Sequence, residues 1–316
     1  MRRRLFVCLC LFAPALLAAD ADFNGRWNIH VKTPRNRVWW LEVRGAGTPT
    51  VTGSFVGALG GQVDPVTNFQ IQNGTLQFSF DRTRDGKPLR QSFQARLEDG
   101  VLKGTGVETL AGEDQPALPW TGIRAPEIRD RDGAEWTAGM PLQLINGKDL
   151  TGWHLLRENA PGWVMENGLL KNQPGSSDLV SDTRFWNFEL LAEYRYREHS
   201  NSGIGLRGRY EIQIYDDFGQ APDKSGHGAL YSRIAPRVNA SAKPGQWQTL
   251  QARLVGRTLT VRLNGRVVLD HVEIVGPTAL TMDADESAPG PVVLQGDHGP
   301  IEFRRLDLVP LRLDSH

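Results

Sequence analysis

Asn-Gly and Asp-Gly pairs punctuate this 316-residue sequence, and they restrict its fold more strongly than any other feature. Such pairs favour backbone turns with positive φ angles, which connect neighbouring antiparallel strands. No segment shows a long 3.6-residue repeat of apolar side chains, so we expect very little helix. The sequence therefore predicts an all-β protein with many tight turns. The eight pairs begin at Asn24, Asn73, Asp85, Asp99, Asp132, Asn146, Asn167 and Asn264.

The clearest predicted hairpin covers residues 258–270. Leu259, Val261 and Leu263 alternate with polar residues, as expected for a strand with one buried face. Asn264-Gly265 then reverses the chain, and a second apolar run follows over residues 267–269. This pattern is typical of two antiparallel strands joined by a two-residue turn.

A charged segment divides the turn-rich sequence into two blocks. Residues 127–133 are dense in charge and lie between Pro126 and Pro141, which is typical of a linker. Each block is long enough to form its own hydrophobic core. We therefore predict an N-terminal β domain over residues 22–125, a linker over 126–140 and a second domain over 141–316.

Short strand-like runs recur through the N-terminal block and are separated by tight turns. This arrangement favours a small antiparallel β-barrel or sandwich. The Gly-Arg-Trp triplet at 25–27 resembles the start of lipocalin-like barrels, and a generic β-sandwich is an equally good interpretation. The predicted strands cover residues 37–43, 50–56, 75–80, 91–97 and 101–107.

The first 21 residues match a secretory signal peptide. Three arginines at 2–4 precede an apolar run over 5–17, and residues 19–21 fit the A-x-A cleavage pattern. The run is too short to cross a membrane as a helix, and no later segment is long enough, so we expect no integral membrane span. An uncleaved anchor is the alternative. Cleavage would leave a periplasmic or secreted chain without cysteine, because Cys8 and Cys10 lie in this segment.

The charge composition argues against a nucleic-acid partner. Lysine plus arginine and aspartate plus glutamate number 36 each, so the formal net charge is zero. A nucleic-acid groove requires a basic excess. The sequence also lacks the patterns of zinc proteases, P-loop proteins and serine hydrolases. We therefore expect function to lie in the polar clusters of the second block.

A polar stripe in the second block is the most informative feature for function. Apolar and polar residues alternate over 202–217, which predicts a single strand with one face in the core. The opposite face is either solvated or lines a binding cleft. Its polar positions are Arg207, Arg209, Glu211 and Gln213, and Asp216 and Asp217 follow at its end.

Two histidines of the second block lie in glycine-rich loops. His227 lies between Gly226 and Gly228, and His298 lies within the Gln-Gly-Asp-His-Gly segment at 295–299. Glycine lets the backbone approach a ligand closely and leaves the neighbouring side chain accessible. Each histidine is therefore either solvated or part of a ligand site.

The second block also contains a series of short motifs in a fixed order. It opens with Leu-Ile-Asn-Gly-Lys-Asp-Leu-Thr-Gly-Trp at 144–153 and continues with Asn-Ser-Gly-Ile-Gly-Leu-Arg at 201–207 and Tyr-Glu-Ile-Gln-Ile at 210–214. Further motifs lie at 228–231, 238–247 and 294–299. Together they resemble the 3-keto-disaccharide hydrolase family, from about residue 144 to 311. Arg305 departs from the family pattern, which commonly has asparagine there.

This resemblance implies a concanavalin-like jelly-roll β-sandwich. It also implies cleavage of the glycosidic bond in 3-keto-disaccharides or 3-keto-glycosides, as a hydrolase or a lyase, so the expected partner is a sugar. A jelly roll has a concave polar sheet face, and we expect the polar stripe to line it. A non-catalytic carbohydrate-binding protein of the cell envelope is the alternative, because sandwich folds serve both roles.

Within the implied site, Glu211 and His298 are the candidate acid–base residues, and Arg207 is the candidate stabiliser of an enolate oxygen. Cleavage by elimination and rehydration and conventional acid–base hydrolysis both remain open. No cofactor is certain, and a divalent metal held by histidine and aspartate is an open alternative. The expected substrate-binding residues are Gln213, Asp216, Tyr231, His227, Gln295 and Arg304.

Overall fold

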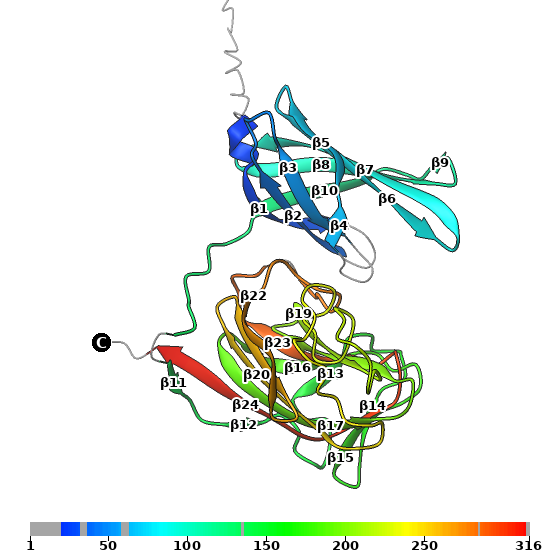
Figure 1. Ribbon diagram of the computed structural model, residues 1–316, viewed down its shortest axis with the longest axis vertical. Coiled ribbons are helices and arrows are strands. Elements are labelled where there is room, and N and C mark those ends of the chain that lie inside the picture. The colour runs from blue at the N-terminus through cyan, green and yellow to red at the C-terminus, as the bar shows by residue number, and fades with distance from the viewer. Residues whose placement is uncertain (1–19, 32–36, 58–62, 134–135, 284, 314–316) are drawn as a thin grey trace, which may run out of the picture.

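The computed structural model describes residues 20–31, 37–57, 63–133, 136–283 and 285–313. One short 3-10 helix, η1 (Asp20–Phe23), occurs in this part of the chain, and the other regular elements are β-strands (Figure 1). No described helix has the length and apolar character needed to cross a membrane. The predicted all-β class is therefore confirmed. Most of the predicted signal peptide, with Cys8 and Cys10, lies outside the described residues.

The first block forms one antiparallel sheet of ten strands that curls into an almost closed barrel (Figure 1). The strand order is β4-β3-β2-β1-β10-β8-β7-β6-β5, and β9 pairs with β8. The strands are β1 (Gly25–Val31), β2 (Arg37–Arg44), β3 (Thr52–Val56), β4 (Val63–Pro65), β5 (Thr67–Gln72), β6 (Thr75–Arg84), β7 (Lys87–Glu98), β8 (Val101–Leu110), β9 (Glu113–Asp114) and β10 (Leu118–Arg124).

Alternating side chains fill the inside of this barrel. Along β7, Phe93 and Ala95 are buried, whereas Ser92 and Gln94 are exposed. Gly104 on β8 leaves space for an indole ring of the neighbouring strand, because a Cβ atom there would come within 2.4 Å of the Trp120 ring. The core also contains Trp27, Trp39, Phe55, Phe78 and Phe80.

The second block forms a sandwich of two antiparallel sheets. The nine-stranded sheet has the order β14-β15-β24-β17-β20-β21-β22, with β11 and β12 paired to β24, and the five-stranded sheet has the order β13-β16-β23-β18-β19. The strands are β11 (Trp136–Ala138), β12 (Leu142–Gln143), β13 (Trp153–Leu155), β14 (Trp163–Glu166), β15 (Leu169–Asn172), β16 (Leu179–Phe185), β17 (Phe188–Tyr196), β18 (Asn201–Leu206), β19 (Tyr210–Tyr215), β20 (Gln248–Val255), β21 (Thr258–Leu263), β22 (Arg266–Glu273), β23 (Gly290–Leu294) and β24 (Ile301–Leu313).

Apolar side chains from both sheets meet in one buried cluster inside this sandwich. Tyr194 and Leu250 of the nine-stranded sheet belong to the same cluster as Ile212 and Leu294 of the five-stranded sheet. Burial of apolar surface between two sheets is what stabilises such a sandwich. The architecture confirms the predicted jelly-roll class, and this core is separate from the barrel core.

Five of the eight predicted turn pairs have positive φ at both residues and close hairpins. They are the pairs that begin at Asn73, Asp85, Asp99, Asn167 and Asn264. The last of them joins β21 to β22, so the hairpin predicted over residues 258–270 is confirmed. At Asn146 the side chain instead accepts the backbone N–H groups of Lys148 and Asp149, which makes a local turn without a hairpin.

The single strand predicted over residues 202–217 is wrong, because the structure has a hairpin there. β18 and β19 pair antiparallel, with Gly203 opposite Gln213 and Gly205 opposite Glu211. The chain reverses at Arg207-Gly208, where φ is 53° and 60°. Arginine rarely adopts positive φ, so the first residue of this turn does not indicate a reversal, although Gly208 permits one.

Much of the predicted linker lies on the second domain. Asp130 accepts hydrogen bonds from Trp186 Nε1 (2.7 Å) and Asn187 Nδ2 (2.6 Å). Asp132 forms an ion pair with Arg253 at 3.1 Å. These contacts fix residues 130 and 132 before β11 joins the sheet.

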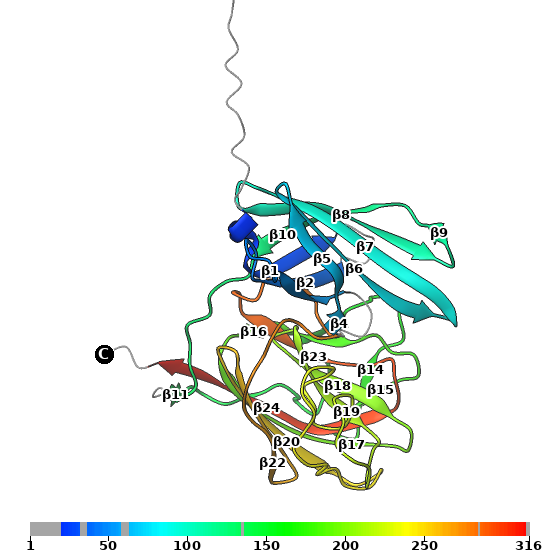
Figure 2. The same cartoon turned by 45° about the horizontal axis from the view of Figure 1, so that its top comes forward.

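The outer side of β1 and β2 contacts the second domain. Trp40 alternates with core residues, yet it is only 1% exposed. Its indole ring packs on Gly276, where a Cβ atom would come within 2.9 Å of the ring. Arg26 adds an ion pair with Glu273 at 3.4 Å. In Figures 1 and 2 the first domain accordingly lies directly against the second.

Candidate functional site

The outer face of the five-stranded sheet carries Glu211 and Gln213, two polar residues of the predicted stripe. Ile212 belongs to the sandwich core, so its neighbours Glu211 and Gln213 point to the opposite face. Opposite them on β18 stand two glycines, Gly203 and Gly205. A Cβ atom at Gly203 would lie 2.5 Å from Glu211 Oε1, so glycine there leaves the space that the carboxyl group occupies. We call this surface the Glu211 face.

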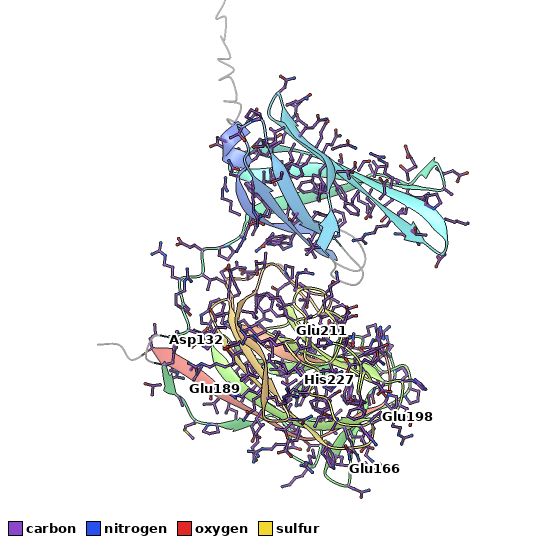
Figure 3. All side chains as sticks on the ribbon, in the orientation of Figure 1. Asp132, Glu166, Glu189, Glu198, Glu211 and His227 are labelled. Atoms are coloured by element: carbon purple, nitrogen blue, oxygen red, sulfur yellow. The ribbon has the colours of Figure 1, made fainter. Side chains whose placement is uncertain are left out.

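The Glu211 carboxyl group is buried without full hydrogen bonding. The residue is 1% exposed, and its Oε2 atom has no hydrogen-bond partner. Burial, together with the nearby carboxylates Asp178 and Asp297, raises the pKa of Glu211 to about 8. A carboxyl group with this pKa is mostly protonated at neutral pH and can donate a proton. Figure 3 shows Glu211 within the second domain.

Asp178 is a second acidic group of this face, and sequence reasoning missed it. Burial raises its pKa, while the backbone N–H of Gly296 donates to Oδ1 at 3.0 Å and lowers it. Asp297 and His298 also interact with it electrostatically. Asp178 directly precedes strand β16, and no sequence motif around it indicates a functional residue.

The loop after β23 brings Asp297 and His298 near the acidic groups of this face, because Asp297 interacts electrostatically with Glu211 and His298 with Asp178. Gln295 anchors this loop, because its N–H donates to Gly203 O (3.0 Å) and its carbonyl accepts the Ser202 hydroxyl (2.8 Å). His298 Nδ1 makes a short hydrogen bond with Asp297 Oδ1, and about half of the histidine side chain is exposed. A carboxylate on Nδ1 fixes the ring and leaves Nε2 for proton transfer. The adjacent Asp297 was not among the predicted site residues.

Tyr231 is placed against the backbone of Glu211. Its N–H donates to Glu211 O at 3.0 Å, and its side chain is partly buried. Burial and the Glu211 carboxylate both raise the pKa of the Tyr231 phenol. The phenol therefore remains a hydrogen-bond donor at neutral pH.

Buried side-chain oxygens without hydrogen-bond partners gather on β18 and β19 and directly after β23. Apart from Glu211 Oε2, they include Gln213 Oε1, Asn201 Oδ1 and Gln295 Oε1. Buried polar atoms are normally paired with protein, water or ligand groups. Acceptor oxygens of this kind fit the hydroxyl donors of a sugar. The structure thus brings together five predicted residues: Glu211, Gln213, Tyr231, Gln295 and His298.

Arg207 does not join this group, although it was predicted to stabilise an enolate oxygen. Its three guanidinium nitrogens donate to Trp186 O, Gly256 O and Asn187 Oδ1. The guanidinium also stacks on the Trp186 ring at 3.9 Å. With every nitrogen engaged and the side chain buried, Arg207 closes its own hairpin turn onto the neighbouring loops.

His227 is likewise enclosed in the core instead of lining the Glu211 face. Nε2 is hydrogen-bonded to the Tyr194 hydroxyl at 2.6 Å and Nδ1 to the Tyr196 hydroxyl at 3.3 Å. Burial lowers the pKa of His227 to about 3, so the ring is neutral at physiological pH. Figure 3 labels it within the second domain, where it is fully buried. Its glycine neighbours allow tight packing there.

The other two predicted binding residues also have structural partners. Asp216 Oδ2 accepts the backbone N–H of His199 at 2.8 Å. Arg304 lies on β24 of the opposite sheet, where its guanidinium stacks over Trp247 (4.4 Å) and Nε donates to Glu193 (2.6 Å). A register shift makes Arg304 and Arg305 both point outward, which explains the break in alternation there.

The described residues contain no group of three or more histidine, cysteine, aspartate or glutamate side chains arranged to hold a metal ion. We therefore assign no metal ligands, and the chemistry below uses only the side chains of this chain.

A family model for the 3-keto-alpha-glucoside-1,2-lyase-like domain matches residues 141–309. Two candidate glycosyl hydrolases from Parabacteroides distasonis are similar in structure. One has 24% identity and a TM-score of 0.47, covering 58% of this chain and 93% of that chain. The other has 20% identity and a TM-score of 0.48, covering 54% and 94%. A carbohydrate-binding module, CBM66 from Bacillus subtilis, has 10% identity and a TM-score of 0.33, covering 50% and 92%. No curated protein matches this chain.

The family match covers 169 of the 316 residues, counting from 141 to 309, and includes all strands of the five-stranded sheet. It confirms the resemblance drawn from the motifs of the second block. The chain therefore belongs to the carbohydrate-active family of 3-keto-alpha-glucoside-1,2-lyase-like domains.

Proposed function

We propose that the second domain cleaves the glycosidic bond of 3-keto-glycosides by elimination followed by rehydration. The observation that carries the proposal is the buried Glu211 carboxyl group, whose pKa of about 8 keeps it protonated at neutral pH. A group of this kind can protonate a departing sugar oxygen. The family to which the domain belongs supports the choice of substrate.

A 3-keto sugar permits this route because of its carbonyl group. The carbonyl at C3 acidifies the proton on C2, so a modest base can remove it and form an enolate. The enolate then expels the substituent on C1 as the C1–O bond breaks, and an acid protonates the departing oxygen. Water adds across the resulting enone at C1 and C2, which restores the 3-keto sugar with a hydroxyl on C1.

Three side chains of the site fit the three tasks of this route. His298, whose Nδ1 is bonded to Asp297, removes the C2 proton through Nε2. Glu211 donates the proton to the departing oxygen. Tyr231, whose raised pKa keeps its hydroxyl protonated, donates a hydrogen bond to the enolate oxygen in place of Arg207.

Conventional hydrolysis is the competing route, because Glu211 and Asp178 supply two carboxyl groups on one face. The two routes differ at C2. In heavy water, elimination and rehydration place deuterium on C2 of the 3-keto product, whereas direct hydrolysis leaves the C2 proton in place. Mass spectrometry of the product measures the deuterium incorporated at C2. The isolated product must be incubated alone to exclude spontaneous exchange.

A non-catalytic carbohydrate-binding role is the second candidate, favoured by the unpartnered acceptor oxygens near Glu211. It predicts binding of 3-keto and unoxidised disaccharides without release of monosaccharide.

We also propose that the protein is exported, on the basis of its tripartite N-terminus. Mass spectrometry of protein from the native host should then show a chain that begins near residue 20 or 22, and a retained Met1 would contradict export.

A further inference from the structure

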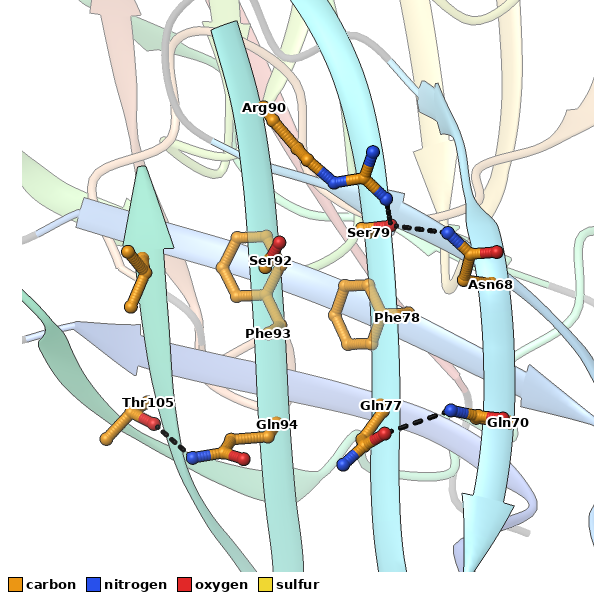
Figure 4. A pocket seen from close by; sticks show the side chains of 11 residues that line it. Asn68, Gln70, Gln77, Phe78, Ser79, Arg90, Ser92, Phe93, Gln94 and Thr105 are labelled. Atoms are coloured by element: carbon orange, nitrogen blue, oxygen red, sulfur yellow. Dashed lines mark hydrogen bonds between the residues drawn. The ribbon is translucent and has the colours of Figure 1, made fainter. Parts of the chain in front are cut away.

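The outer face of the barrel sheet in the first domain is hollowed into a groove. Two adjoining hollows of about 410 and 540 Å³ share Gln77, Gln94 and Thr105. Figure 4 shows the first of them. Their lining side chains come from β5, β6, β7 and β8, which are neighbours in the sheet. We call this surface the amide groove, and it is defined by Asn68, Gln70, Gln77, Ser79, Gln94 and Thr105.

Hydrogen bonds across the strands hold the amides of the groove in a row. Gln70 Nε2 donates to Gln77 Oε1 at 2.9 Å, and Gln94 Nε2 donates to Thr105 Oγ1 at 3.2 Å (Figure 4). Gln77 and Gln94 are direct cross-strand partners. A primary amide has two N–H donors and an oxygen with two lone pairs, so one or two bonds leave capacity for a ligand. The row is a pre-oriented set of neutral donors and acceptors.

A second row is organised around a buried hydroxyl group. Ser79 is 4% exposed, and its Oγ accepts hydrogen bonds from Asn68 Nδ2 (3.2 Å) and Arg90 Nη2 (3.0 Å). Among the residues that line the two hollows, charge is confined to Arg90, Arg96 and Lys103. Arg90 and Arg96 are the first and last residues of β7 that line the hollows, and Lys103 is the first residue of β8 that does so. The middle of the groove is therefore uncharged.

We propose that the amide groove binds a neutral polysaccharide segment, as a site separate from the Glu211 face. Sugar hydroxyls both donate and accept hydrogen bonds, so an array of amides and hydroxyls matches them along its length. A strand face that serves only solubility usually carries interspersed charges instead. Phe78, Phe93 and Val107 also line the first hollow, but the two phenylalanines are buried in the barrel core, so they offer a protein partner little exposed apolar surface.

The dimensions of the groove fit an extended chain. Four neighbouring strands span roughly 14 Å, because adjacent strands lie about 4.8 Å apart. A short oligosaccharide stretch laid across the strands would meet Gln70, Gln77, Gln94 and Thr105 in turn. This inference stands on the first domain alone, and it shares no residue with the proposed catalytic group.

Affinity electrophoresis of the full mature chain tests the proposal. The probes are the neutral polymers hydroxyethyl cellulose, laminarin and galactomannan, and polygalacturonate is the anionic comparison. We expect at least one neutral polymer to retard the protein. The double variant Gln77→Ala/Gln94→Ala should weaken this binding by about tenfold or more, because two ligand hydrogen bonds are lost. Gln115→Ala removes an exposed amide outside the groove and should leave binding unchanged.

A second variant separates loss of the site from loss of folding. Ser92 is exposed in the groove, so Ser92→Trp fills it while the barrel core stays intact. Circular dichroism should show folded protein for all variants. Glu211→Gln should retain polymer binding even where it loses turnover, so the two proposals can fail independently. Binding to no neutral polymer, binding to polygalacturonate alone, or undiminished binding by both groove variants would overturn the proposal.

Discussion

The two domains place polar side chains on the outer face of a sheet in contrasting ways. In the amide groove, Gln77 and Gln94 are exposed and bonded to neighbouring side chains on the same face. On the Glu211 face, Glu211 and Gln213 are buried, and each has an oxygen without a partner. Exposed neutral amides keep their ordinary chemistry, whereas a buried carboxyl group acquires a pKa of about 8.

This contrast shows what burial adds to a polar surface. Water screens charge and supplies hydrogen bonds at an exposed surface, so side chains there recognise a ligand without becoming reactive. Removal of water disfavours the charged form of a carboxyl group and makes it a proton donor near neutral pH. We therefore assign binding to the first surface and chemistry to the second. The predictions below test this division, beginning with the largest expected effect.

The first prediction concerns stability against pH. The pKa of Glu211 is about 8 in the folded chain and near 4.5 in an unfolded chain, so the unfolded state loses its proton first. Wild-type stability should therefore fall as pH rises from about 4.5 to 8. Glu211→Gln cannot ionise, so over this range its free energy of unfolding should rise relative to that of the wild type by on the order of 5 kcal/mol. Denaturant unfolding of both proteins at several pH values measures it, and a constant difference would contradict burial of an ionisable group.

The second prediction concerns Arg207, the cation that does not belong to the Glu211 face. Arg207→Ala leaves three acceptors without their donor, so the free energy of unfolding should fall by about 3 kcal/mol. Turnover per folded molecule should stay unchanged at a temperature where the variant is folded. Arg262→Ala, at an exposed arginine, is the matched control. A stable variant that loses turnover would show that Arg207 belongs to the catalytic site.

The third prediction concerns turnover of 3-keto-disaccharides. Glu211→Gln and His298→Ala should each lower turnover by at least about a hundredfold, because each removes a proton-transfer group. Wild-type turnover should also decline as pH rises through about 8, where Glu211 loses its proton. Released monosaccharide measured from pH 5 to 10 tests both statements. If both variants keep full turnover, the Glu211 face is not the site.

The smallest expected effect is that of Arg304→Ala. Arg304 lies on the nine-stranded sheet and pairs with Glu193, so its removal should leave turnover unchanged. Stability should fall by no more than about 1 kcal/mol, as is usual for exposed ion pairs. A large loss of turnover would mean that the two sheets contribute to one site.

Sequence reasoning succeeded where a local pattern fixes the backbone. Five turn pairs close hairpins because asparagine and aspartate tolerate positive φ and glycine favours it. The sequence does not indicate the reversal at Arg207-Gly208, because its first residue is not a turn former and long-range contacts hold it in place. The alternation therefore predicts one strand where the structure has two, although Glu211 and Gln213 still lie on one face.

Site prediction was limited by what sequence cannot show about burial. His227 and His298 have similar glycine-rich surroundings, yet His227 is enclosed by Tyr194 and Tyr196 and His298 is half exposed. Only the tertiary fold distinguishes them. Asp178 can be assigned to the site only from the structure, because its contact with Gly296 joins residues that are distant in sequence.

The position of β24 in its sheet has a consequence for the order of folding. The barrel takes all its strands from residues 25–124, so it can fold as soon as this part of the chain has emerged. In the second domain β24 lies between β15 and β17 and also pairs with β11 and β12. The middle of that sheet is thus supplied by the last strand to be synthesised, and β15 and β17 have no shared partner before it arrives. Pairings of such long sequence separation form slowly, so we expect the second domain to complete its sheet only after β24 has been synthesised, at a stage when the barrel can already fold.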